Sequence, residues 1–202
     1  MPGRGWIFLG IGNCLAAGFD DAPGAPGLPI FYGGYMTAQR NGIVGESKIT
    51  NHIIDCLSFI PLFDGLSPAD LRIVAKHMHF IEVDEGELVF EEGEPGDYVC
   101  FVASGSLEVI KESSKGERAA LATLSRGRSI GEMALIDEFP RSATVIAKTS
   151  ATLITLSRGN FNLILANHPQ AGVPVLKGLS RLLSMNLRKT SGQLANLMLS
   201  YE

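Results

Sequence analysis

The stretch Gly131-Glu132-Met133-Ala134-Leu135 is followed, after a short spacer, by Pro140-Arg141-Ser142-Ala143-Thr144. Gly131 and Ala134 are small enough to let a ligand approach the backbone, and the residues after Gly131 predict one short helical turn. The first N–H groups of such a turn lack partners and carry partial positive charge, which suits an anion. Arg141 adds a planar fork of donors matched to two oxygens of one phosphate. Ser142 adds a hydroxyl and a backbone N–H.

Glu132 has the same sign of charge as a phosphate, so it must serve another part of the ligand. A carboxylate beside an anion site is useful when the ligand also carries hydroxyl groups, as a ribose does. The alternative is a surface turn with a Glu–Arg pair, followed by an ordinary strand. The stretch itself favours a ligand with one phosphate and a nearby sugar hydroxyl.

This stretch resembles the phosphate-binding cassette of cyclic nucleotide-binding domains, which reads Gly-Glu-x-Ala-Leu, a few residues, then Pro-Arg-small-Ala-Thr. The matching residues are Gly131, Glu132, Ala134, Leu135, Pro140, Arg141, Ala143 and Thr144. The upstream pattern of the family is also present, at Gly86, Leu88-Val89-Phe90, Glu92-Gly93, Gly96-Asp97, Phe101-Val102 and Ser104-Gly105. The resemblance runs roughly from Leu57 to Leu199.

The resemblance implies a mainly β fold with flanking helices, namely an eight-stranded antiparallel jelly-roll β-barrel with a long C-terminal helix. It also implies a cyclic nucleotide as ligand. Glu132 would hold the ribose hydroxyl, and Arg141 with Ser142 and nearby backbone amides would hold the cyclic phosphate. The ligand-binding residues expected in the cassette are Gly131, Glu132, Met133, Ala134, Arg141, Ser142 and Ala143.

The bulk composition excludes several other classes of protein. The chain has 202 residues, a formal net charge of -4 and a pI of about 5.6, so it lacks the basic footprint of a nucleic-acid binder. Its three cysteines form no disulfide framework or zinc pattern and favour a reducing, cytoplasmic setting; they are Cys14, Cys56 and Cys100. Cys100 lies in an apolar stretch and is expected to be a small buried hydrophobe.

Residues 1–46 are interpreted as a Gly- and Pro-rich N-terminal extension, and residues 47–202 as the cyclic nucleotide-binding domain. The apolar run Trp6–Phe19 is too short for a membrane span. It could be a signal peptide or anchor, although its charge and cleavage pattern are poor. Met36 could be the true start of translation, with residues 1–35 not native. The remaining alternative is an extension that packs on the domain.

A helical lead-in is expected over residues 47–79. Apolar residues recur at helical spacing from Ile49 to Ile60, and Pro61 stops the run. A second helix begins after Ser67, a good N-cap, with Pro68 at its first position and Asp70 three residues after the cap.

Residues 80–157 are expected to form the β-roll, because glycines punctuate short apolar runs at close intervals. The runs 107–110 and 120–124 flank Ser113-Ser114-Lys115-Gly116, which predicts a hairpin.

C-terminal helices are expected over residues 158–200. Asn167-His168-Pro169 breaks the first of them, and Pro174 is taken to open a long final helix that ends near Leu199. An apolar stripe close to a heptad repeat follows this helix, formed by Leu176, Leu179, Leu183, Leu187, Leu194 and Leu197. Such a stripe needs a partner, either the protein's own barrel or a second copy; we favour a homodimer through this helix.

Thr190 and Ser191 resemble a Thr-Ser pair on the long helix of the bacterial catabolite activator branch of the family, where the pair contacts adenine. Their hydroxyls could bond the amino edge of the base. Ser142 stands where cGMP-selective members often place Thr. The resemblance therefore favours cAMP over cGMP, which remains possible.

No catalytic constellation is present, so we expect a regulatory module and not an enzyme. His77 and His79 have the spacing of a metal-binding pair, but no further histidine is near in sequence, so no metal is expected. A metal-dependent jelly-roll enzyme and a dimeric scaffold that no longer binds nucleotide are the alternatives.

Transcription activators of this family continue into a helix-turn-helix. None follows here before Glu202, so DNA binding is not expected. We expect the output to pass to an unidentified partner protein through movement of the C-terminal helix. The alternative is a free-standing sensor or a nucleotide sink.

Overall fold

The computed structural model describes residues 46–112 and 116–200, with side chains from Lys48 onward. The expectations for residues 1–35, the alternative start at Met36 and the environment of Cys14 lie outside these described residues.

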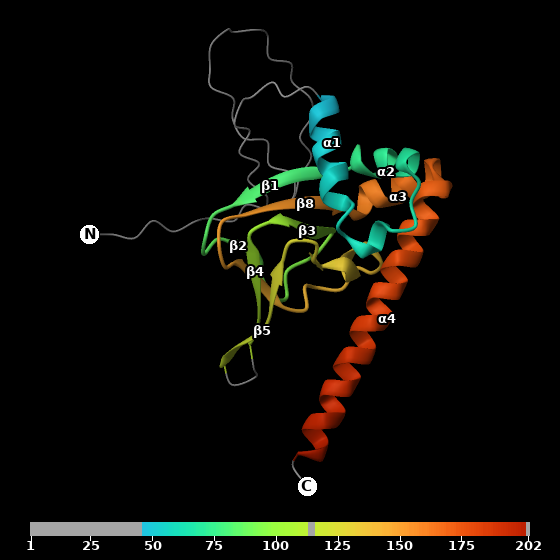
Figure 1. Ribbon diagram of the computed structural model, residues 1–202. Coiled ribbons are helices and arrows are strands. Elements are labelled where there is room, and N and C mark those ends of the chain that lie inside the picture. The colour runs from blue at the N-terminus through green and yellow to red at the C-terminus, as the bar shows by residue number, and fades with distance from the viewer. Residues whose placement is uncertain (1–45, 113–115, 201–202) are drawn as a thin grey trace, which may run out of the picture. The chain divides into compact units, whose positions relative to one another are not determined.

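Eight antiparallel strands of the described residues form two four-stranded sheets (Figure 1). In order, the first sheet contains β1 (His79–Val83), β8 (Ala151–Ser157), β3 (Tyr98–Ser104) and β6 (Ser129–Ile130). The second contains β2 (Leu88–Phe90), β7 (Thr144–Ala147), β4 (Ser106–Glu112) and β5 (Arg118–Ser125). The mainly β class with flanking helices is confirmed. Closure into a single eight-stranded barrel is not, because no described strand of one sheet is paired with a strand of the other.

Strand β3 is buried on both faces, which explains its nearly continuous apolar sequence. Val99 and Phe101 belong to the core that the helices cover. Tyr98 and Cys100 alternate with them and therefore face the second sheet, where the Tyr98 hydroxyl donates to the Val89 carbonyl oxygen at 3.0 Å. The first sheet is thus packed between the helices and the second sheet.

The helices gather on the outer face of the first sheet (Figure 1). They are α1 (Glu46–Leu57), η1 (Pro61–Phe63), α2 (Pro68–Ala75), α3 (Arg158–Asn167) and the long α4 (Pro169–Leu199). The predicted start of the second helix is confirmed, since Pro68 opens α2 and the Ser67 side chain accepts a hydrogen bond from the Asp70 N–H. The predicted hairpin is confirmed as β4 and β5, which pair antiparallel.

The expected start of the final helix at Pro174 is wrong, because α4 begins at Pro169 and Pro174 lies inside it. Proline there removes the N–H that would bond the Gln170 carbonyl. Gln170 is exposed, so water can solvate that carbonyl. The buried residues Ala171 and Gly172 meanwhile hold the extra turn against α3; a Cβ at Gly172 would come within 2.9 Å of Leu165.

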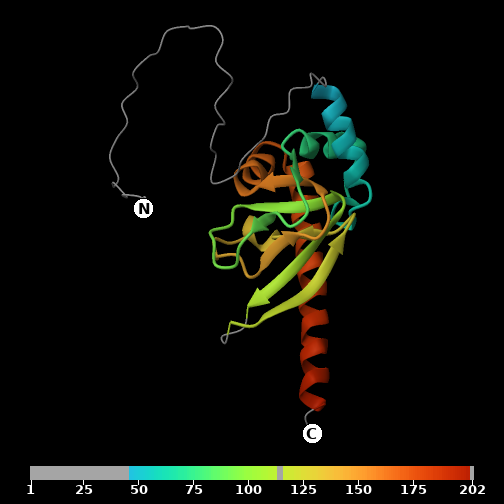
Figure 2. The same cartoon turned by 90° about the vertical axis from the view of Figure 1, so that its left-hand side faces the viewer.

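Helix α4 is anchored only along its first half. Leu179 is buried and Leu183 is half-buried, but all residues from Ser184 to Ser200 are exposed, with Leu187 68% exposed and Leu194 57%. Figure 2 shows this second half running past the sheets. The apolar stripe therefore does not pack back on the protein's own sheets beyond Leu183 in the described residues.

Two glycines of α4 should respond in opposite ways to replacement by alanine. A Cβ at Gly178 would lie 2.2 Å from the Leu62 carbonyl oxygen, whereas a Cβ at Gly192 would meet nothing within 4 Å. We expect Gly178→Ala to lower the free energy of unfolding by about 1–3 kcal/mol, because the helix must move away from η1. Gly192→Ala should raise it by about 0.5–1 kcal/mol through helix propensity.

Urea denaturation followed by circular dichroism measures both variants. A stabilising Gly178→Ala would show that the close packing of α4 on η1 is not rigid.

Candidate functional site

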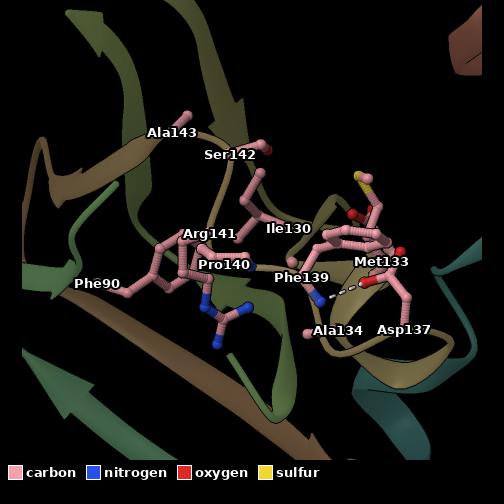
Figure 3. Close-up of a pocket in the computed structure, with 12 residues that line it drawn as sticks. Phe90, Ile130, Met133, Ala134, Asp137, Phe139, Pro140, Arg141, Ser142 and Ala143 are labelled. Carbon is pink, nitrogen blue, oxygen red and sulfur yellow. Dashed lines mark hydrogen bonds between the residues drawn. The ribbon is translucent and has the colours of Figure 1, made fainter. Parts of the chain in front are cut away.

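A cavity of 80 Å³ opens where the turn after β6, the loop before β7 and the end of β2 meet (Figure 3). Seven of the nine ligand-binding residues expected from the sequence line it. The full lining is Phe90, Ile130, Gly131, Glu132, Met133, Ala134, Asp137, Phe139, Pro140, Arg141, Ser142 and Ala143. The fold therefore brings both halves of the cassette to one place.

The turn at the start of the cassette depends on Gly131. Its φ of 84° lies in the left-handed region, where it lets β6 pass directly into the single turn η2 (Glu132–Leu135), as predicted. A Cβ at this position would stand 2.5 Å from Nη1 of Arg141. Gly131 is thus required both by the backbone and by the approach of the guanidinium.

The two charged residues of the cassette are both buried, with Glu132 8% exposed and Arg141 6%. Ser129 Oγ donates to Oε1 of Glu132 at 2.6 Å, which orients the carboxylate. The ion pairs of the described residues do not include one between Glu132 and Arg141. The alternative of a solvated Glu–Arg pair on a surface turn therefore does not describe this site.

Arg141 is held by its backbone and by its side chain. Its N–H donates to the Glu94 carbonyl at 2.8 Å, and its own carbonyl accepts from the Gly93 N–H at 2.9 Å. Nη1 donates to the Tyr98 carbonyl at 2.9 Å. The guanidinium carbon lies 4.1 Å from the ring centroid of Phe90 and 4.4 Å from that of Tyr98, within range of cation–π attraction.

Two nitrogen donors of this guanidinium have no acceptor among the described residues. Nε and Nη2 of Arg141 are buried and have no hydrogen-bond partner among the described residues. Buried polar groups are nearly always paired, so an unpaired buried cationic edge calls for an acceptor that the chain does not supply. Nε–H and one Nη2–H point from the same edge of the plane, which is the arrangement that binds two oxygens of one anion.

A salt bridge supports the far end of the cassette. Lys111 Nζ donates to the Ser142 carbonyl at 2.8 Å and also pairs with the Glu92 carboxylate. The hydrogen bond from Lys111 holds the pKa of Glu92 below its usual value. Ser142 itself is exposed, so its hydroxyl remains accessible at the rim of the cavity.

Thr190 and Ser191 do not line this cavity. Both lie on the exposed second half of α4 and are themselves exposed. The structure thus leaves the two expected base-reading residues apart from the seven that it brings together.

Cys100 lies in β3 with no exposed surface. Burial raises the pKa of its thiol to about 12; the positive charge of Arg141 opposes this rise and the negative charge of Glu132 adds to it. The thiol therefore stays protonated near neutral pH and acts as a small apolar group, as expected from the sequence, and not as a nucleophile.

The histidines do not assemble a metal site in the described residues. His77 Nδ1 is hydrogen-bonded to the Ile73 carbonyl at 2.9 Å, and the rings of His77 and His168 lie 6.4 Å apart. No group of three or more His, Cys, Asp or Glu side chains in the described part of the chain could hold a metal ion.

A family model described as "Cyclic nucleotide-binding domain" matches residues 80–168. A crystal structure of a cyclic nucleotide-binding domain from Methylobacillus flagellatus superposes with a TM-score of 0.66 and 30% identity, covering 75% of this chain and 85% of that one. The chain belongs to the cyclic nucleotide-binding domain family. The matched residues contain the whole cavity and end at His168, before α4 begins.

Two curated proteins with a similar segment are named as regulators. A CRP-like cAMP-activated global transcriptional regulator of Mycobacterium tuberculosis is 26% identical over 137 residues, 68% of this chain and 59% of that protein. A cAMP-dependent protein kinase regulatory subunit of Yarrowia lipolytica is 38% identical over 109 residues, 54% of this chain and 28% of that protein. The chain thus spans only part of the length of either relative. No helix in the described part of the chain is long and apolar enough to cross a membrane.

Sequence reasoning missed several residues of the site. Phe90 was assigned only to the family pattern, and Tyr98 and Lys111 were given no role. Nothing local marks them, because each reaches the cassette from another strand.

Proposed function

We propose that this chain is a cyclic-nucleotide receptor module with cAMP as its ligand, and that it acts by binding and not by catalysis. The observation that carries the proposal is the buried edge of Arg141, where Nε and Nη2 lack acceptors. The exocyclic oxygens of a cyclic phosphate are two acceptors on one phosphorus, and they match this edge. Membership of the cyclic nucleotide-binding domain family supports the same ligand class.

Glu132 would accept a hydrogen bond from the ribose hydroxyl. Its Oε1 is already fixed by Ser129, which leaves the carboxylate oriented but not neutralised by Arg141. Ser142, exposed at the rim, would add its hydroxyl to the phosphate. The two charged residues thus serve different ends of one ligand.

We propose that binding rearranges this site. The cavity of 80 Å³ is smaller than the 300 Å³ or more that is usual for small-molecule sites, and the Arg141 donors are closed to solvent. A ligand can shift an equilibrium only by preferring one state. We propose that the liganded state moves α4, which brings Thr190 and Ser191 to the adenine, either from the same chain or from a second copy.

The exposed second half of α4 supports a homodimer. Its apolar stripe includes Leu187 and Leu194, both more than half exposed, whereas the cations Arg181 and Arg188 lie on the opposite side by helical spacing. Pairing two such stripes would bury apolar surface without opposing like charges. The regulated output would then pass to a partner protein.

The alternatives are a cGMP receptor and a scaffold of the same fold that binds no nucleotide. Calorimetric titration with cAMP and, separately, with cGMP discriminates them. Micromolar or tighter cAMP binding with weaker cGMP binding supports the proposal. Tighter binding of cGMP would support the assignment of the pocket but would show that the preferred base is guanine and not adenine. Binding of neither nucleotide would favour the scaffold.

Arg141→Ala should lower cAMP affinity by roughly 30-fold to several thousand-fold, because losing a buried charge partner typically costs about 2–5 kcal/mol. Arg118→Ala, at an exposed arginine of β5, is the matched control and should change affinity less than about twofold. Isothermal calorimetry gives the affinities and circular dichroism checks the fold. Unchanged affinity in folded Arg141→Ala would refute the site.

Thr190→Ala and Ser191→Ala should each weaken cAMP binding about three- to tenfold, the usual worth of one neutral hydrogen bond. Both should leave cGMP binding nearly unchanged, so the ratio of the two affinities is the measured quantity. Ser184→Ala, on the same exposed half of α4, controls for effects on the helix. Equal losses for both nucleotides would contradict a role in reading the base.

Leu187→Arg should convert the dimer to monomer, because it places a cation in the apolar stripe. Met185→Arg is the control: Met185 is similarly exposed, at 61% against 68%, but lies away from the stripe. Sedimentation equilibrium measures the state of association. A monomeric parent protein, or equal disruption by both variants, would argue against this interface.

A further inference from the structure

We propose that the side chains of Phe90 and Tyr98 form an aromatic cage that positions the Arg141 guanidinium for the ligand's phosphate. Both are positioning residues, since they act through Arg141. This inference rests on the proposed function of the pocket as a cyclic-nucleotide site, and it adds to that site two residues that the cassette pattern does not contain.

The cage contacts the guanidinium from two directions. Its carbon is 4.1 Å from the Phe90 centroid and 4.4 Å from the Tyr98 centroid. The two rings stand nearly at right angles, 80°, with centroids 6.2 Å apart. Phe90 ends β2 in one sheet and Tyr98 begins β3 in the other. The cation is therefore fixed where the two sheets meet.

The cage is itself held in place. The Tyr98 hydroxyl donates to the carbonyl of Val89, the residue before Phe90, at 3.0 Å, so the two walls are tied together. The Tyr98 carbonyl oxygen accepts a hydrogen bond from Nη1 of Arg141. Gly96 and Gly131 leave room for the guanidinium, since a Cβ at either would come within 2.7 Å of it.

These contacts leave one edge of the guanidinium available. The guanidinium carbon lies over the faces of both rings, and the Tyr98 carbonyl oxygen accepts from Nη1, so the edge formed by Nε and Nη2 is the part left for an anion. The cation–π contacts do not use the Nε and Nη2 donors, so they do not compete with an anion for them. A lysine ammonium has no such pair of parallel donors, so the site favours arginine.

The first experiment is made without ligand. The ¹⁵N-labelled protein should show an Arg141 Nε–H resonance that is displaced by ring currents and exchanges slowly with water; Arg141→Lys assigns it by removing it. Tyr98→Leu and Phe90→Leu should move this resonance toward the position of a free arginine and speed its exchange. Tyr98→Phe keeps the ring and should retain the shift. An unchanged resonance in both leucine variants would overturn the cage.

The second experiment measures cAMP affinity in a double-mutant cycle. Tyr98→Leu and Phe90→Leu should each weaken binding about five- to tenfold. Tyr98→Phe, which loses only the hydroxyl bond to Val89, should change it less than about twofold. In the Arg141→Lys background, Tyr98→Leu should also cost less than about twofold.

The two experiments separate the inference from the proposed function. One contrary result is that Tyr98→Leu lowers cAMP affinity by the same factor in the parent protein and in the Arg141→Lys variant. That result would show a general effect on packing and would overturn the positioning role. If the parent protein binds neither cAMP nor cGMP, the proposed function fails. In that case the Arg141 Nε–H resonance without ligand is the only test of whether the cage exists. If Tyr98→Leu does not fold, the Arg141 resonance and the cAMP affinity are both measured with Phe90→Leu and Tyr98→Phe instead.

Discussion

The burial of one guanidinium between two sheets is the constraint on which the rest of this site depends. Removing a charge from water is costly unless other groups compensate, and Arg141 is only 6% exposed. The compensation visible in the protein is a single carbonyl bond and two aromatic faces. Gly96 and Gly131 have to be glycine because the guanidinium fills the space beside them. Nε and Nη2 of Arg141 have no acceptor among the described residues, so this compensation is incomplete.

Helix α4 is firmly packed along its first half and exposed along its second half. Its first half shares a core with η1, α2 and α3, and close contacts such as that of Gly172 with Leu165 fix its position. After Leu183 all of its described residues are exposed, including the apolar ones. A helix of this kind can exchange partners along its free half without disturbing the core, because the two halves rest on different contacts.

The sequence predicted the local features well, since each depends on neighbours along the chain. The cap at Ser67, the hairpin of β4 and β5 and the helical turn after Gly131 all follow from residue types a few positions apart. The features it did not predict depend on tertiary packing. Pro174 looks like a helix start until the packing of Gly172 on α3 extends the helix back to Pro169.

The residues of the candidate site also fall into two groups. Some belong to the local cassette motif, and others reach it only through tertiary contacts. The cassette residues could be named because their motif is contiguous, and the fold gathers seven of them around one cavity. Tyr98 and Lys111 act on the cassette from other strands, so no spacing reveals them. Thr190 and Ser191 are exposed and are not among the residues that line the cavity. Their proposed role therefore depends on a movement or a second copy, and no motif specifies either.

A chain of contacts connects the cavity to α4. The cassette loop is bonded to the start of α3, where Arg158 Nη1 donates to the Asp137 carbonyl at 2.6 Å. Asp137 lines the cavity, and α3 in turn packs on α4 through Leu165 and Gly172. Contiguity of this kind becomes a signalling route only if α4 has two arrangements that the ligand distinguishes. Arg141 is the residue at which such a distinction is proposed, because its Nε and Nη2 are buried and have no acceptor among the described residues.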